Sequence, residues 1–178
     1  VYEIKKLIRP GRDISLNEVI KSISPGLDTG IIGFNICFDI PNFGSYKEQI
    51  KFYEQVKKTS LEKGVVSVFA SEVNEELGLD NKIEYINNLQ PTFFISFNPE
   101  VDDSINYFKG TFSESLLGKK IAENLASTLK VKSIGKSSNI LKQTKSVGII
   151  INGKFFQKND IELILESVTN TLNKQFEN

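Results

Sequence analysis

Histidine is absent from all 178 residues of this chain, and so are methionine and tryptophan. Without histidine, neither a Ser-His-Asp nor a Cys-His catalytic arrangement can form. Cys37 is the only cysteine, which excludes an intrachain disulfide. It lies in the apolar run 31–38, and a nucleophilic cysteine normally needs a base nearby. The sequence therefore predicts a small buried hydrophobic side chain at this position, not a reactive thiol.

Excess charge and long hydrophobic runs are also lacking. Lys+Arg and Asp+Glu both number 22, so the formal net charge is zero. This balance, without a basic stripe, argues against a nucleic-acid partner. No apolar run approaches the length of a transmembrane segment. We do not expect residues 1–6 to begin a signal peptide, because no apolar stretch follows the lysines, and any export signal would lie upstream. Since methionine is missing, we expect a processed protein or an excised domain.

Strand-like and helix-like patterns alternate from residue 31 onward. Strands are expected at 30–38, 65–70, 92–97 and 147–151, an edge strand at 105–110, and helices at 46–63, 79–89 and 113–129. A last helix is expected to open at Asn159 as its N-cap, with Glu162 three residues further on. The alternation predicts a single α/β domain over 31–178, with a mainly parallel twisted sheet and helices on both faces. Residues 1–30 are expected to be a lead-in segment or the end of a preceding domain.

Ligands of such sheets bind beyond the carboxyl ends of the strands, and several segments at those ends resemble one known family. Asp39-Ile40-Pro41-Asn42-Phe43-Gly44 resembles Asp-Pro-Gly-His-Gly-Gly, and Glu48 follows it at a helix start. Residues 79–87 resemble Leu-x-x-Arg-x-x-x-Ala-Asn, with Lys82 in place of Arg. Ser96-Phe97-Asn98 resembles Ser-Ile-His, and residues 141–155 resemble a Leu-Arg, Pro-Ala-Val-Leu-Val-Glu, Gly-Phe pattern. The family is the zinc-dependent N-acetylmuramoyl-L-alanine amidases, the type-3 cell-wall amidases.

This resemblance implies an amidase-like fold whose zinc and catalytic residues have been replaced. Asn42 and Asn98 take the places of two zinc histidines, Asn152 takes the place of the catalytic glutamate, and only Glu48 is retained. Zinc favours imidazole and thiolate ligands over neutral amides, and one carboxylate does not hold it. We therefore expect no zinc, no other cofactor and no catalytic residue. The binding cleft would be a degenerate one, formed by Asn42, Glu48, Asn98 and Asn152.

Each of these four residues also has a purely structural interpretation. Glu48 suits the positive end of a helix dipole. Asn42 and Asn98 suit turns that follow strands, and Asn152-Gly153 suits a tight turn. Alternatively, the three amides line a shallow cleft that hydrogen-bonds a peptide or a sugar without cleaving it.

Two acidic clusters offer a different kind of site. Glu72, Glu75 and Glu76 follow the second strand, and Asp102 and Asp103 follow the third. Calcium prefers oxygen ligands, but such clusters are more commonly solvated loops.

The resemblance predicts a catalytically inactive amidase-like domain in the bacterial cell envelope, periplasmic or otherwise extracytoplasmic. Its partner would be a peptidoglycan fragment or a cell-wall protein such as an active wall hydrolase that it regulates. One alternative is a peptidoglycan hydrolase with an atypical, all-oxygen metal site or none, using Glu48 and a loop acid. A second alternative is a structural protein-protein interaction domain that uses its surface.

Overall fold

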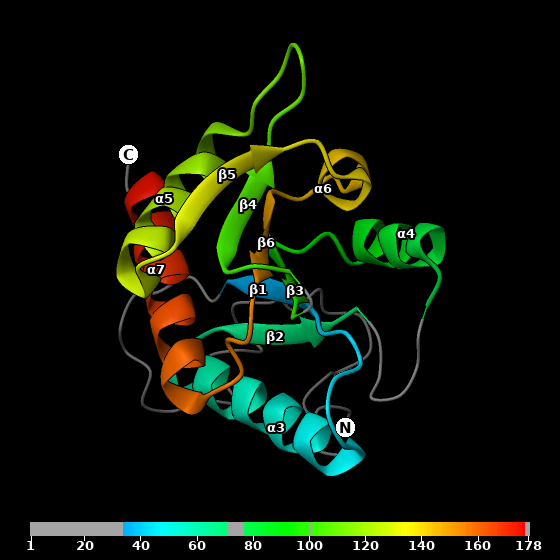
Figure 1. Cartoon of the computed structure of the whole chain (residues 1–178), viewed down its shortest axis with the longest axis vertical. Coiled ribbons are helices and arrows are strands. Elements are labelled where there is room, and N and C mark those ends of the chain that lie inside the picture. The colour runs from blue at the N-terminus through cyan, green and yellow to red at the C-terminus, as the bar shows by residue number, and fades with distance from the viewer. Residues whose placement is uncertain (1–33, 71–76, 100, 177–178) are drawn as a thin grey trace, which may run out of the picture. The chain divides into compact units, whose positions relative to one another are not determined.

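One six-stranded sheet forms the centre of the domain, in the order β2-β1-β3-β6-β4-β5 (Figure 1). The computed structural model describes residues 34–70, 77–99 and 101–176. All neighbouring strands are parallel except β4 and β6, which run antiparallel. The strands are β1 (Asn35–Asp39), β2 (Val66–Phe69), β3 (Phe93–Asn98), β4 (Ser104–Phe108), β5 (Lys132–Lys136) and β6 (Gly148–Asn152).

Helices cover both faces of this sheet, which confirms the predicted α/β architecture. Alternate residues of each strand face opposite layers. Phe93, Ile95 and Phe97 of β3 join the larger core, while Phe94 joins a smaller core on the other face. The larger core is shared with α3 (Tyr46–Glu62), α5 (Leu116–Leu129) and α7 (Lys158–Phe176), and the smaller core with α4 (Leu79–Leu89) and α6 (Asn139–Gln143).

The helix limits follow local capping chemistry. Ser45 and Glu48 form a reciprocal capping box at the start of α3, and Gly64, with φ +70°, follows its end. α5 starts later than predicted because the Ser115 hydroxyl accepts from the Gly118 N–H, 3.2 Å away. The predicted N-cap at Asn159 is wrong. The helix already begins at Lys158, and the Asp160 carboxylate accepts from the Gln157 N–H at 3.1 Å.

Two predictions about the second half of the sheet need correction. Residues 105–110 were expected to form an edge strand, but β4 lies between β6 and β5. β5 is the edge strand on that side of the sheet, opposite β2, and neither β5 nor α6 was predicted. β5 alternates between exposed and half-buried residues, with lysine at both of its ends, so it lacks the apolar run of a buried strand. The lead-in predicted at 1–30 lies outside the described residues.

Candidate functional site at the carboxyl edge of the sheet

Asn98 and Asn152 lie side by side, because they are register partners at the ends of the parallel strands β3 and β6. The Gly153 N–H donates to the Asn98 carbonyl oxygen at 2.9 Å and extends this ladder by one bond. The structure thus brings together two of the four residues that the sequence singled out. Gly153 has φ +108° and bends the chain away from the strand toward α7. The Asn152-Gly153 pair is therefore a strand-ending bend.

The Asn152 side chain is fixed by a hydrogen bond across the sheet. It is 2% exposed, and its Nδ2 donates to the Ser104 hydroxyl at 2.9 Å. Ser104 is the register partner of Asn152 on β4, and its hydroxyl donates to the Asp102 carbonyl oxygen at 3.2 Å. This chain of bonds joins β6 to the start of β4, at the same edge of the sheet where β1 and β3 end.

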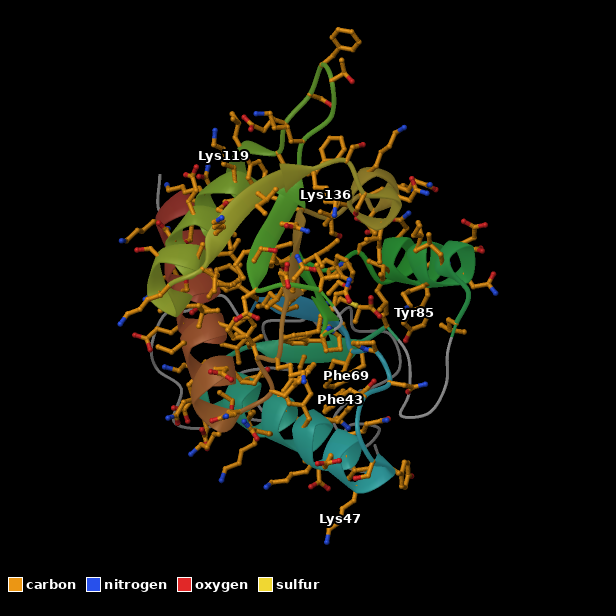
Figure 2. The ribbon with its side chains drawn as sticks, viewed as in Figure 1. Phe43, Lys47, Phe69, Tyr85, Lys119 and Lys136 are labelled. Atoms are coloured by element: carbon orange, nitrogen blue, oxygen red, sulfur yellow. The ribbon has the colours of Figure 1, made fainter. Side chains whose placement is uncertain are left out.

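Asn42 is exposed on the connection between β1 and α3, which an aromatic contact anchors. Phe43 stacks on Phe156, with ring centroids 4.1 Å apart and ring planes 6° apart. Phe52 meets both rings edge-on, and Figure 2 labels Phe43 above α3. Phe156 belongs to the connection that follows Asn152. Stacking therefore fastens the loop that carries Asn42 to the loop that leaves the Asn98–Asn152 pair.

Glu48 has a structural role at the start of α3, where it forms a capping box with Ser45. Its Oε2 accepts from both the backbone N–H and the hydroxyl of Ser45, each at 2.7 Å. These bonds, the backbone bond foremost, lower the pKa of the Glu48 carboxyl below its ordinary value of 4.5. One of the two carboxylate oxygens of Glu48 is thus engaged in the helix cap.

A buried charged cluster beside these residues was not predicted. The Lys82 ammonium, from α4, lies 2.8 Å from Asp39 Oδ1, and the Ser96 hydroxyl donates to Asp39 Oδ2 at 2.8 Å. Asp39 and Ser96 are register partners on β1 and β3. The side chains of Asp39 and Lys82 are only 7% and 18% exposed. The available signal was Ser96, a polar residue inside the otherwise apolar run 93–97.

Six polar residues of β1, β3, β4 and β6 lie on one face of the sheet, near the edge where β1, β3 and β6 end. Strand alternation places them on the face that carries α4 and α6. Their groups are neutral amides and hydroxyls around one internally paired carboxylate. Five members of the set are buried, and the half-buried Asn98 is the one that a ligand could reach for hydrogen bonding. We refer to this set as the polar edge: Asp39, Ser96, Asn98, Ser104, Asn106 and Asn152.

The four predicted site residues do not supply the donor set that zinc prefers. Asn42, Asn98 and Asn152 offer neutral amides, and the Glu48 carboxylate is engaged by Ser45. Across residues 34–70, 77–99 and 101–176, no three Cys, Asp or Glu side chains gather in a group that could hold a metal ion. The acidic residues Glu72, Glu75 and Glu76 lie outside the described ranges. Asp102 and Asp103 are exposed.

Cys37 is a core residue, as predicted. It is fully buried in the smaller core, with Phe94 and Ile86 among the members of that cluster. Burial, with a further contribution from the negative charge of Asp39, raises the pKa of its thiol to about 12. A thiol with this pKa stays protonated at neutral pH and is a poor nucleophile.

The fold described above is that of the N-acetylmuramoyl-L-alanine amidases. No family model matches the sequence, and no curated protein matches it. Among solved structures, the chain is similar to N-acetylmuramoyl-L-alanine amidase AmiC2 of Nostoc punctiforme, with a TM-score of 0.54, 12% identity and coverage of 82% of this chain and 98% of that one. An N-acetylmuramoyl-L-alanine amidase from Clostridium difficile 630 gives a TM-score of 0.55 at 12% identity, covering 82% and 97%.

A third similar structure is Cwp6 from Clostridium difficile, with a TM-score of 0.57 and 12% identity. The match covers 80% of this chain but only 29% of the length of Cwp6. At these identities the likeness establishes the fold alone. None of the helices in the described part of the chain has both the length and the apolar character that a membrane span requires.

Proposed function

We propose that this chain is a non-catalytic, amidase-like domain of the bacterial cell envelope that binds peptidoglycan at its polar edge. The observation that carries the proposal is the pairing of Asn98 and Asn152 at the carboxyl ends of β3 and β6. These are the positions at which the resemblance expects a zinc histidine and a catalytic glutamate. The fold of a wall amidase is kept, while the groups that would activate water are amides.

The chemistry of peptidoglycan suits the groups at this edge. Its glycan strands carry hydroxyl and acetamido groups, and its stem peptides carry amides. Side-chain amides donate and accept hydrogen bonds with both kinds of group. Asn98 is half-buried at the strand end, so it combines a fixed backbone with partial access to solvent. Asn42 is exposed on a neighbouring loop whose Phe43 packs against the larger core, on the opposite face of the sheet, so the proposal does not depend on it.

A sedimentation assay with insoluble peptidoglycan sacculi tests the proposal. We expect the wild-type chain to co-sediment, and Asn98→Ala to weaken binding about three- to tenfold, the usual range for one lost hydrogen bond. Asn170→Ala is the matched control, because Asn170 is exposed on α7, on the other side of the sheet. Thermal unfolding of both variants verifies that they are folded. Equal binding by Asn98→Ala and wild type would refute this location for the site.

The enzyme alternative is a hydrolase that uses Glu48 with a loop acid. The Ser45 bonds disfavour it, because they lower the pKa of Glu48 and hold its oxygen in the helix cap. A general acid needs the opposite shift. Release of stem peptides from muropeptides by wild type but not by Glu48→Gln would establish this alternative and end the binding-only proposal.

A further inference from the structure

The connection between β4 and α5 is a short hairpin that carries an apolar side chain at its turn. Lys109 and Glu114 form an antiparallel bridge, and the Gly110 N–H donates to the Ser113 carbonyl oxygen at 2.8 Å. Phe112, inside this turn, is 99% exposed. Turn positions of this kind usually carry glycine, asparagine, aspartate or serine. A phenylalanine here contributes nothing to the core, and its whole side chain is available to a partner.

Several contacts hold this hairpin in one conformation. The Ser115 N–H donates to the Phe108 carbonyl oxygen at 3.0 Å. Glu114 Oε1 accepts from the Tyr107 hydroxyl at 3.1 Å and lies 3.7 Å and 3.6 Å from the ammonium groups of Lys109 and Lys119. The turn is thus tied to both β4 and α5. A binding element that is already ordered loses little conformational entropy when it meets its partner.

A second apolar side chain and a set of lysines surround the turn. Leu116, the first residue of α5, is 76% exposed. Figure 1 shows the hairpin projecting beyond the ends of β4 and β5, and Figure 2 shows Lys119 and Lys136 near its base. No ion pair within the described ranges engages Lys120 or Lys136. The surface around the hairpin therefore carries more lysines than carboxylates: Lys109, Lys119, Lys120 and Lys136 against Glu114 and Glu123.

We propose that this hairpin inserts Phe112 into the interfacial region of a bilayer that contains anionic lipid, with Leu116 following and the lysines contacting the headgroups. Phe112 at the tip and Leu116 at the start of α5 expose too little apolar surface for the area that a specific protein interface buries on each partner. They do suit shallow insertion, where apolar burial and attraction between lysines and anionic headgroups add together. The surface is distinct from the polar edge, and the inference does not depend on the function proposed for that edge.

Vesicle co-sedimentation of the full chain tests this inference. Wild type is expected to bind vesicles of mixed phosphatidylcholine and phosphatidylglycerol, and to bind less to phosphatidylcholine alone or at high salt. Phe112→Ser should weaken binding about tenfold, because one large apolar side chain then stays in water. Lys120→Gln combined with Lys136→Gln should weaken binding only to the anionic vesicles.

Leu61→Ser is the matched control, since Leu61 is 64% exposed on α3, away from the hairpin. It should bind as wild type does. Both positions are solvent-exposed, so neither substitution removes a core contact. Absence of binding to the anionic vesicles, or equal binding by Phe112→Ser and wild type, would overturn the proposal. Self-association that depends on Phe112 without vesicle binding would overturn it too, and would indicate a protein partner instead.

Discussion

The ammonium of Lys82 lies 2.8 Å from Asp39 Oδ1, in a contact that joins α4 to the end of β1. Both residues belong to segments that resemble amidase motifs in sequence, and the structure brings those segments together. The contact also explains how a carboxylate remains buried beside the polar edge. Its charge is balanced by Lys82, and its other oxygen accepts from Ser96 at 2.8 Å.

Removing the Lys82 ammonium should therefore destabilise the folded protein. We expect Lys82→Met to lower the free energy of unfolding by about 2–3 kcal/mol, because Asp39 would remain buried without its counter-charge. Lys58→Met is the control, since the Lys58–Glu62 pair is 4.0 Å apart and exposed, and it should cost less than about 0.5 kcal/mol. Urea unfolding measures both. Adding Asp39→Asn to Lys82→Met should restore part of the loss, and a lack of any restoration would contradict the pairing.

Gly153 should not tolerate a side chain. Its φ is +108°, and an added Cβ would collide with the Asp103 carboxylate and approach the Phe155 ring. Gly153→Ala should cost about 2–3 kcal/mol, from backbone strain and collision together. Gly78→Ala is the matched control, because Gly78 has φ −56° and open space around its Cα. Thermal unfolding distinguishes the two variants. In an Asp103→Ala background the cost of Gly153→Ala should fall only by the part that the Asp103 collision causes, since the backbone strain and the Phe155 contact remain.

The helix cap makes a prediction about pH. The pKa of Glu48 is lowered by the Ser45 backbone N–H first and by the Ser45 hydroxyl second. A lowered pKa means that the cap stabilises the fold above pH 4.5 and that this stabilisation is lost as the pH falls through the folded pKa. In Ser45→Ala the pKa should rise but stay below 4.5, since the backbone bond remains. Carboxyl NMR titration measures it, and an unchanged pKa in Ser45→Ala would contradict this account.

Cys37 should be inert in the folded protein. Its thiol is buried and its pKa is raised to about 12, so almost no thiolate exists at pH 8, where thiol reagents are commonly used. We expect labelling by a disulfide reagent only after urea unfolds the chain. Rapid labelling without denaturant would show that the thiol is accessible and that the smaller core opens readily.

Much of the fold could be predicted because strands and helices near the centre carry clear periodicity. α4 was predicted with its observed limits, and α3 was predicted one residue too long. β5 and α6 could not be found in this way. β5 has lysines at two of its three exposed positions and no apolar run, and α6 has only five residues, too few to show a helical period. β4 is an inner strand because β5 pairs with its outer side, so its position could not be predicted without β5.

The site was only partly predictable for a related reason. Asn98 and Asn152 were found because both end strands, and the ends of parallel strands share an edge. The contact of Asp39 with Lys82 and Ser96 was missed because it joins three elements, and no local pattern records which elements will meet. For Glu48 the sequence offered a ligand role and a helix-dipole role, and the structure shows capping bonds that neither interpretation specified.

The central claim is that the chain binds peptidoglycan without cleaving it. The most direct test incubates the purified chain with peptidoglycan sacculi, once with and once without added zinc, and then analyses the pellet and the supernatant. We predict protein in the pellet and no released stem peptides in the supernatant under either condition. Release of stem peptides would contradict the claim that the amidase chemistry is absent. Protein remaining in the supernatant, with the sacculi intact, would contradict the claim that the polar edge binds peptidoglycan.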